Sequence, residues 1–177
     1  MRTLGLQRMP GTVVLEQETL AHVASLPEGG WRGQITARDG NVWVLTPDDR
    51  KLTRFDAATV AESGEFRLDR GAVGLLVDER GVLVLHADAQ VVRLDPVTGA
   101  ERQRARLPEG TTELVAGPGV LWGLRGHHPG PEGDQSVSLV QVDPSTLGVQ
   151  REVELGRSIY AGAPYLAEDK VVALIEV

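Results

Sequence analysis

Short apolar runs separated by polar turns recur along the whole chain. The clearest runs are residues 42–45, 82–85 and 120–124, and each begins one or two residues after a glycine. Apolar runs of this length are typical of strands that are covered on both faces of a sheet. No segment long enough to form a helix shows helical periodicity, so the pattern predicts an all-β fold.

Each apolar run opens a repeating unit that predicts four strands. A turn and a second strand follow the run, and that strand ends at an acidic residue, as in "VVRLD" and "SLVQVD". A more polar strand comes next, as in "AERQRARL", and a last segment leads to the next glycine. Charge on the polar strand is expected at a water-facing edge. A blade is therefore predicted as a four-stranded antiparallel sheet that begins with the segment before the glycine and ends with the polar strand outermost.

Two features of the unit recur with the same phase. The acidic residue falls at Glu16, Asp56, Asp95 and Asp143, at intervals of 40, 39 and 48 residues, each time with a threonine three residues later. The glycine-led apolar run keeps its place relative to this residue. The long third interval has a local cause, a polar Gly/Pro-rich insertion at residues 125–135. A shared period near 40 residues indicates a repeat architecture.

The residue types around the acidic position are those of a tight turn. In "LDPVTGAE", Asp95 is placed to accept hydrogen bonds from backbone N–H groups two residues on, Pro96 presets φ, and Gly99 supplies a positive φ. A catalytic carboxylate would need one cleft and a partner base, which four equivalent copies argue against. We therefore interpret the motif as a hairpin between two antiparallel strands.

These repeats resemble a known group of proteins. A period near 40, an apolar strand led by glycine, and "LDPVTGA" or "VDPSTLG" at the following hairpin are similar to β-propeller blades of the quinoprotein-like, YVTN and lyase types. The resemblance covers nearly all of the chain. It implies a propeller fold but no single function, because propellers include enzymes, binding modules and scaffolds. The tryptophan that usually follows the motif in pyrroloquinoline quinone enzymes is missing, so we expect no quinone cofactor.

The repeats predict one propeller domain over residues 1–177. Three complete blades are expected at 31–68, 71–107 and 111–155, and a fourth is expected from 158–177 together with 12–26, so that the two chain ends close the ring. Three arrangements stay open: a four-bladed monomer, an eight-bladed ring formed by a homodimer, and a piece of a longer propeller. We favour the homodimer over the monomer because propellers with this repeat length usually have more than four blades.

Composition narrows the classes of partner. The chain has 177 residues and a net charge of −7 without a basic cluster, which argues against nucleic acid and anionic membrane surfaces. No apolar run approaches the roughly 20 residues of a membrane span. The N-terminal segment lacks the apolar region of a secretory signal, which predicts a cytoplasmic protein. Cysteine is absent, which excludes disulfides and thiolate metal sites.

The resemblance also suggests where a site would lie. Propeller ligands usually bind on the face formed by the loops from the outermost strand to the next blade and from the second strand to the third. Loop residues expected there include Arg50, His86 and Asp88, and the candidate ligand-binding residues are Trp31, Arg32, Arg125, His127, His128 and Tyr160. Trp31 and Tyr160 have an alternative interpretation as side chains packed within or between blades.

The insertion at 125–135 is the clearest departure from the repeat. Long loops on a rigid scaffold often carry function. His127, His128 and Asp134 offer imidazole and carboxylate ligands that suit a divalent metal, although adjacent histidines also occur in plain solvated loops.

Two functional hypotheses follow. We predict a non-enzymatic binding or interaction module that recognises a small polar ligand or a protein on one propeller face and needs no cofactor. The alternative is a metal-dependent lyase or hydrolase with its site at the propeller mouth.

Overall fold

The computed structural model describes the backbone of residues 12–15, 22–26, 34–126 and 135–158, and of 160–161, 165–167, 170–172 and 175–176 near the C-terminus. Side chains are described for residues 34–126 and 136–156. Every regular element in this part of the chain is a strand, which confirms the all-β prediction. The described residues include no helix long and apolar enough to cross a membrane.

Three four-stranded antiparallel sheets, called blades 1 to 3 below, form the centre of the molecule. Within each blade the strands pair in chain order. Blade 1 contains β3 (Gln34–Arg38), β4 (Asn41–Thr46), β5 (Lys51–Asp56) and β6 (Glu62–Arg67). Blade 2 contains β7 (Ala72–Asp78), β8 (Gly81–His86), β9 (Gln90–Leu94) and β10 (Glu101–Arg106). Blade 3 contains β11 (Thr111–Gly117), β12 (Val120–Gly126), β13 (Gln135–Val142) and β14 (Val149–Ser158).

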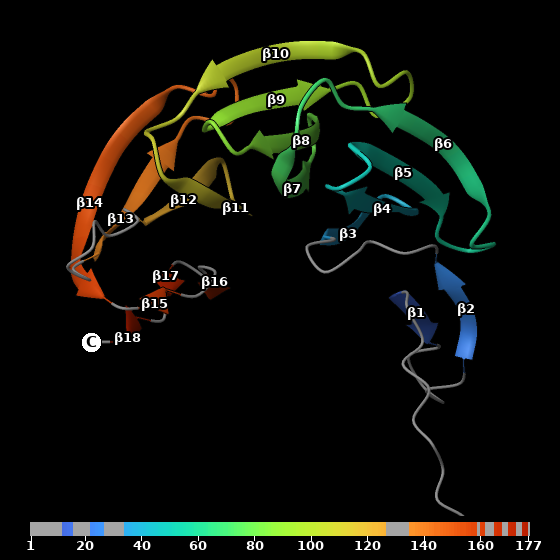
Figure 1. The fold of residues 1–177 in the computed structure, drawn as a ribbon, viewed down its shortest axis with the longest axis horizontal. Helices are drawn as coiled ribbons and strands as arrows, with labels where there is room; N and C mark the ends of the chain where they lie inside the picture. Colours follow the sequence, from blue (N-terminus) through green and yellow to red (C-terminus); the bar gives the residue numbers. More distant parts are fainter. Residues whose placement is uncertain are drawn as a thin grey trace, which may run out of the picture.

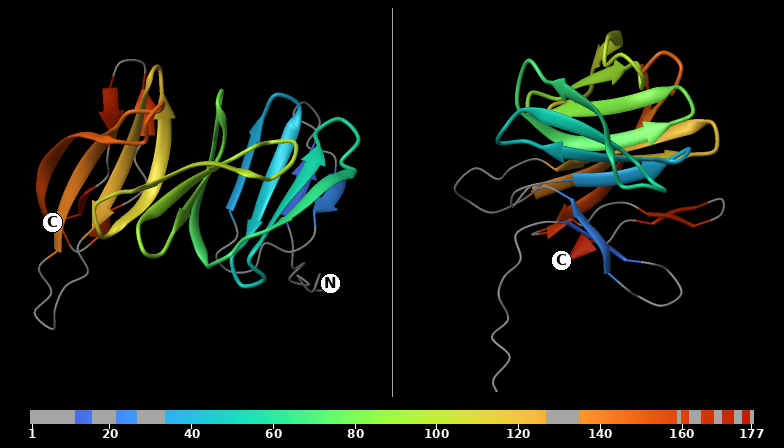
Figure 2. Two further views of the ribbon diagram at one scale, coloured as in Figure 1. Left: turned by 90° about the horizontal axis from the view of Figure 1, so that it is seen from above. Right: turned by 90° about the vertical axis from the view of Figure 1, so that its right-hand side faces the viewer.

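The three blades lie side by side in an arc. The first strand of each blade lies on the inside of the arc and the fourth on the outside (Figures 1 and 2). The inner strands contact one another, β7 touching both β3 and β11. Four-stranded antiparallel blades with this order, inner strand first, are the architecture that the repeats predict. The prediction of a propeller fold is confirmed.

Shorter strand pairs lie at the two ends of the arc. The N-terminal pair is β1 (Thr12–Leu15) with β2 (His22–Leu26), beside blade 1 (Figure 1). The C-terminal pairs, beside blade 3, are β15 (Tyr160–Ala161) with β18 (Ile175–Glu176), and β16 (Tyr165–Ala167) with β17 (Lys170–Val172). Among the described strands, no hydrogen-bonded pair joins the two chain ends. The fourth blade and the eight-bladed ring therefore stay predictions.

The core is built between neighbouring blades. Trp43, Leu45 and Leu52 of blade 1 pack against Val82 and Val84 of blade 2. A second cluster joins blades 2 and 3 in the same way. Because alternate side chains of β8 face opposite neighbours, this strand is buried at every position. That arrangement explains why its sequence is a continuous apolar run without alternation.

The outer strands show the reverse pattern. In both β6 and β10 four of the six positions are exposed, and exposed and half-buried positions alternate from the second position onward. The exposed positions of β10 carry Glu101, Arg102, Arg104 and Arg106. This confirms that the most polar strand of each unit lies at the water-facing edge of its blade.

The acidic hairpins form as predicted. The Oδ1 atom of Asp95 accepts hydrogen bonds from the backbone N–H groups of Val97 at 2.8 Å and Thr98 at 2.7 Å. Asp56 and Asp143 make the corresponding bonds in blades 1 and 3. At the fifth position of the turn φ is positive in all three copies, although only blade 2 has glycine there. The side-chain bonds of the aspartate thus hold the turn with or without glycine.

The stability of the protein is expected to fall between about pH 4 and pH 2 because of these turns. Hydrogen bonds from Thr98 and its neighbour hold the pKa of Asp95 at about 2, below the ordinary value of 3.8. Hydrogen bonds likewise lower the pKa of Asp143 to about 2, and the largest contribution comes from the hydroxyl group of Ser145. A folded-state pKa below the unfolded one gives stability that is present above the unfolded pKa and lost as the pH falls through the folded value. Urea unfolding at a series of pH values measures this loss.

The matched control is the double variant Asp95→Asn, Asp143→Asn. It removes both titrating groups and should flatten this part of the pH profile while leaving the blades folded at pH 7. An equally steep profile in the double variant would contradict the assignment.

Two arginines connect successive blades at the same repeat position. Arg54 Nη1 donates to the carbonyl oxygen of Pro96 at 2.5 Å, joining blade 1 to the acidic hairpin of blade 2. Arg93 Nη2 donates to the carbonyl oxygen of Pro144 at 2.7 Å, joining blade 2 to the hairpin of blade 3. Both arginines precede the acidic residue of their own blade by two positions, where blade 3 has Gln141.

Candidate functional site

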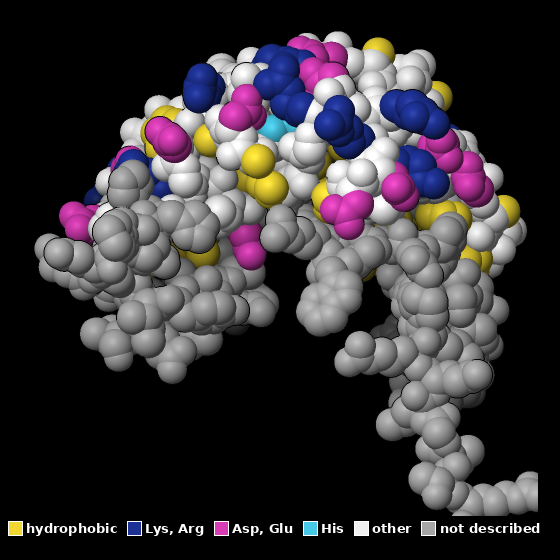
Figure 3. All heavy atoms as spheres, in the orientation of Figure 1, with side chains coloured by type: hydrophobic (Ala, Val, Ile, Leu, Met, Phe, Trp, Pro, Cys, Tyr) yellow, Lys and Arg dark blue, Asp and Glu magenta, His cyan; other side chains and the backbone are white. Residues whose placement is uncertain are grey.

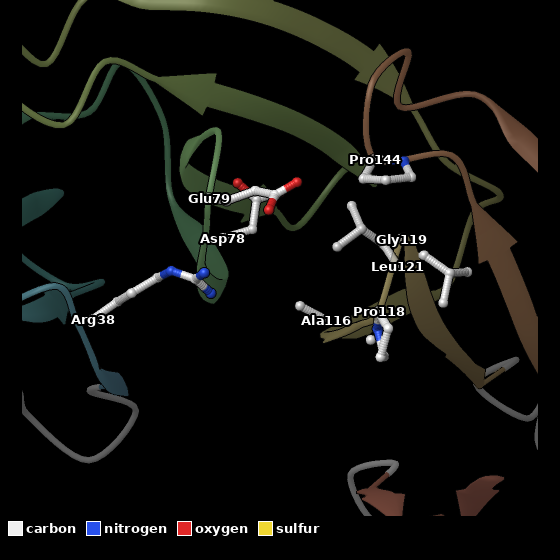
Figure 4. Close-up of a pocket in the computed structure, with 10 residues that line it drawn as sticks. Arg38, Asp78, Glu79, Ala116, Pro118, Gly119, Leu121 and Pro144 are labelled. Carbon is white, nitrogen blue, oxygen red and sulfur yellow. The ribbon is translucent and has the colours of Figure 1, made fainter. Parts of the chain in front are cut away.

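A pocket lies where turns of three blades meet. It encloses about 380 Å³ and lies at the turns between the first and second strands of the blades. Figure 4 shows Arg38 and the acidic pair Asp78 and Glu79 on one side of the space, with blade 3 on the other. The described residues that line it are Arg38, Asp78, Glu79, Ala116, Gly117, Pro118, Gly119, Val120, Leu121 and Pro144.

Local sequence explains how these residues are held. Arg38 is the last residue of β3, directly before the turn at 39–40. Asp78 ends β7, and its Oδ1 accepts a hydrogen bond from the backbone N–H of Arg80 at 2.8 Å, which fixes the turn into β8. The turn from β11 to β12 at 117–119 consists of glycine and proline only, so the wall from blade 3 is mostly apolar.

Two charged side chains of the lining are held only loosely. Arg38 Nε lies 3.4 Å from Asp39 Oδ2, and Glu79 Oε1 lies 3.2 Å from Arg80 Nη1. The Arg38 side chain is 41% exposed and that of Glu79 is 72% exposed. Exposed ion pairs of this kind contribute little, so either charge is available to a ligand.

The third charged residue, Asp78, is held firmly. Its side chain is 9% exposed, and its Oδ1 accepts a hydrogen bond of 2.5 Å from Arg93 Nη1, whose side chain is 4% exposed. Within the described part of the chain, Asp78 Oδ2 and Arg93 Nε have no hydrogen-bond partner. Buried polar atoms are nearly always paired, so this carboxylate stands out among the lining residues.

The predicted ligand face lies at the opposite ends of the strands, and the structure describes part of it. There Arg125 is engaged within its own blade, since its Nε donates to the Glu109 carbonyl oxygen at 2.8 Å and its Nη1 pairs with Glu152 at 2.6 Å. Arg50 closes a turn through its backbone N–H, which donates to Pro47.

His86 is buried on the same predicted face. Its Nδ1 lies 3.2 Å from the Gly71 carbonyl oxygen, and burial lowers the pKa of the imidazole. A smaller pocket of about 190 Å³ adjoins it between blades 1 and 2. Asp88 pairs with Arg70 at 2.9 Å. Basic and acidic side chains are interspersed over the view in Figure 3, without a large patch of one sign.

The other predicted site residues lie outside the described side chains. They are Trp31, Arg32, His127, His128, Asp134 and Tyr160, of which Tyr160 is described only as part of the backbone of β15. The ligand and metal roles given to them stay predictions. Among the side chains that the structure does describe, no group of three His, Cys, Asp or Glu would hold a metal ion.

Sequence reasoning missed Arg38, Asp78 and Glu79. The turns that carry them, "ARDGN" and "LVDERG", read as ordinary connections between strands. The available signal was that both turns are charged and occupy the same place in successive repeats. That signal places them on one face of the molecule but does not reveal a pocket, because the separation of the blades is set by packing.

Comparison with known proteins supports the fold. No family model matches the sequence, and no curated protein matches it either. Among solved structures, BBS1N in complex with ARL6DN has a TM-score of 0.65 at 16% identity, covering 92% of this chain and 50% of that one. BamB from Moraxella catarrhalis has a TM-score of 0.58 at 19% identity, and the match covers 81% of this chain and 42% of BamB. Glutaminyl cyclase from Myxococcus xanthus has a TM-score of 0.54 at 15% identity, and the match covers 76% of this chain and 59% of the cyclase.

These similarities identify the chain as a β-propeller repeat protein. The chain spans about half the length of the solved structures to which it is similar. At identities below 20% the likeness concerns the fold alone.

Proposed function

We propose that the protein is a non-enzymatic binding module that recognises a small polar ligand in the pocket between the blade turns. The observation that supports this most directly is the convergence of Arg38, Asp78 and Glu79 from two blades on one space of about 380 Å³, closed by the apolar turn of blade 3. Pockets of about 300–1,000 Å³ with apolar walls and a few polar groups are typical of small-molecule sites.

The chemistry of the lining favours binding over covalent catalysis. Among the described lining residues there is no serine, threonine, cysteine, lysine or histidine, so no hydroxyl, thiol or amine nucleophile stands beside the carboxylates and the guanidinium. Among the similar structures, one was solved with a protein partner and another is named as a cyclase, so the fold alone does not decide between binding and catalysis.

The proposal predicts a localised response to small polar compounds. Isotope-labelled full-length protein would be titrated with agmatine, glutarate and glucose, representing basic, acidic and neutral polar ligands, and followed by amide NMR shifts. At least one probe should give saturable shifts confined to the turns around Glu79 and 117–119. Shifts spread evenly over the blades, or none at millimolar concentration, would contradict the proposal.

The matched variant is the double substitution Arg38→Ala, Glu79→Ala. Both side chains are exposed, so the blades should stay folded, as shown by an unchanged spectrum away from the pocket. The affinity for the active probe should fall by about tenfold or more, since both charged contacts are lost.

A further inference from the structure

We propose that the ligand of this pocket presents an ammonium or guanidinium group to the wall formed by Asp78 and Glu79. The inference rests on the proposed function and adds the chemical class of the ligand. It is carried by the unequal hydrogen bonding of the two Asp78 oxygens and by the arrangement of charge around the pocket.

The Asp78 carboxylate has one saturated oxygen and one unsatisfied oxygen. Oδ1 accepts from Arg93 Nη1 at 2.5 Å and from the Arg80 backbone N–H at 2.8 Å. Oδ2 accepts no bond from the described part of the chain and is itself buried, so a ligand in the pocket that this residue lines reaches it only when the carboxylate turns toward the pocket. A carboxylate oxygen can accept only, so the group that completes it must be a donor, and a charged N–H donor forms the stronger bond.

Glu79 adds negative charge to the same wall. Arg93 balances the charge of Asp78, while the largely exposed Glu79 has, among the described residues, an ion pair with Arg80 alone, at 3.2 Å. Figure 4 shows both carboxylates on the same side of the space. The whole chain has a net charge of −7, which draws cations toward the protein over a longer range. Two adjacent carboxylates favour a cationic group over an anionic one at this wall.

The remaining lining suggests the rest of the ligand. Arg38 extends from β3 on the same side of the space as the two carboxylates, and its guanidinium suits a carbonyl or carboxylate of the ligand (Figure 4). Ala116, Leu121 and Pro144 provide an apolar surface for an aliphatic stem. A basic amino acid, or a basic residue within a peptide, combines these three features.

The test compares basic probes with an acidic probe. L-arginine, N-acetyl-Gly-Arg-Gly amide and glutarate would each be titrated into the full-length protein, again followed by amide NMR shifts. The two basic probes should shift the amides of Glu79, Gly117 and Gly119 saturably, and added salt should weaken binding. Tighter binding of the blocked peptide would indicate that the basic group belongs to a protein partner. Tighter binding of arginine would indicate that the ligand is a free amino acid.

Glu79→Lys tests the acidic wall without disturbing the buried ion pair. It should weaken both basic probes by about tenfold or more, since it places a like charge at the wall. Glu154→Lys, an exposed position on β14 with the same change in net charge, should alter the affinity less than about twofold.

The outcomes separate the two proposals. Saturable pocket shifts with glutarate or glucose but not with the basic probes would overturn this inference and leave the binding module standing. An equal loss of affinity in Glu79→Lys and Glu154→Lys would also overturn it, because only the overall charge would then matter. The absence of pocket shifts with every probe would overturn both.

Discussion

Replacing Asp78 by alanine is expected to lower the free energy of unfolding by about 3–5 kcal/mol. The substitution leaves the guanidinium of Arg93, only 4% exposed, without its anion in the interior. Breaking a buried pair from one side costs about this much, because the remaining charge is neither solvated nor compensated. Arg93 also donates to Pro144, so its displacement would loosen the contact between blades 2 and 3. Urea unfolding followed by tryptophan fluorescence measures the change.

Two controls bracket this prediction. Glu79→Ala removes the neighbouring acid, whose ion pair is exposed, and should cost less than about 0.5 kcal/mol. The double variant Asp78→Leu, Arg93→Met removes both buried charges and should recover at least about half of the loss. A loss of less than about 1 kcal/mol for Asp78→Ala would contradict the prediction, because the guanidinium of Arg93 would then not be left as an uncompensated buried charge.

The second large effect is expected at Gly99, in the acidic hairpin of blade 2. A Cβ atom there would lie 2.1 Å from Cδ1 of Phe66 in blade 1, and the residue has φ of +70°. Phe66 stacks on Trp43 with ring centroids 5.8 Å apart, so the ring cannot move without disturbing the interface of blades 1 and 2. Strain from overpacking and from the left-handed backbone together predict a loss of about 2–4 kcal/mol for Gly99→Ala in urea unfolding.

Gly119→Ala isolates the contribution of the contact. Gly119 has the same φ of +70°, but a Cβ atom there would meet nothing within 4 Å. Only the backbone strain remains, so the cost should be about 1–2 kcal/mol. Equal losses of stability for the two substitutions would show that the Phe66 side chain moves aside at little cost and that its contact with residue 99 does not contribute to the free energy of unfolding.

Local features of this protein could be read from the sequence because they depend on neighbours in the chain. The apolar run of β8 follows from burial on both faces, and the charges of β10 from its exposed edge. The hairpin at Asp95 follows from bonds between residues two and three positions apart. Repetition of these signals at a period near 40 residues then gives the blades, since each unit repeats the same short-range chemistry.

The pocket and the contacts between blades were decided by the tertiary structure. Asp78 meets Arg93 across 15 residues, and Arg93 meets Pro144 across 51, so no local pattern marks either contact. The sequence indicates that Gly99 is a turn residue, yet in the fold the ring of Phe66 from the neighbouring blade also occupies the space that a Cβ atom would need there. Packing between apolar faces sets the spacing of the blades, and that spacing determines which polar side chains are enclosed and which face holds the pocket.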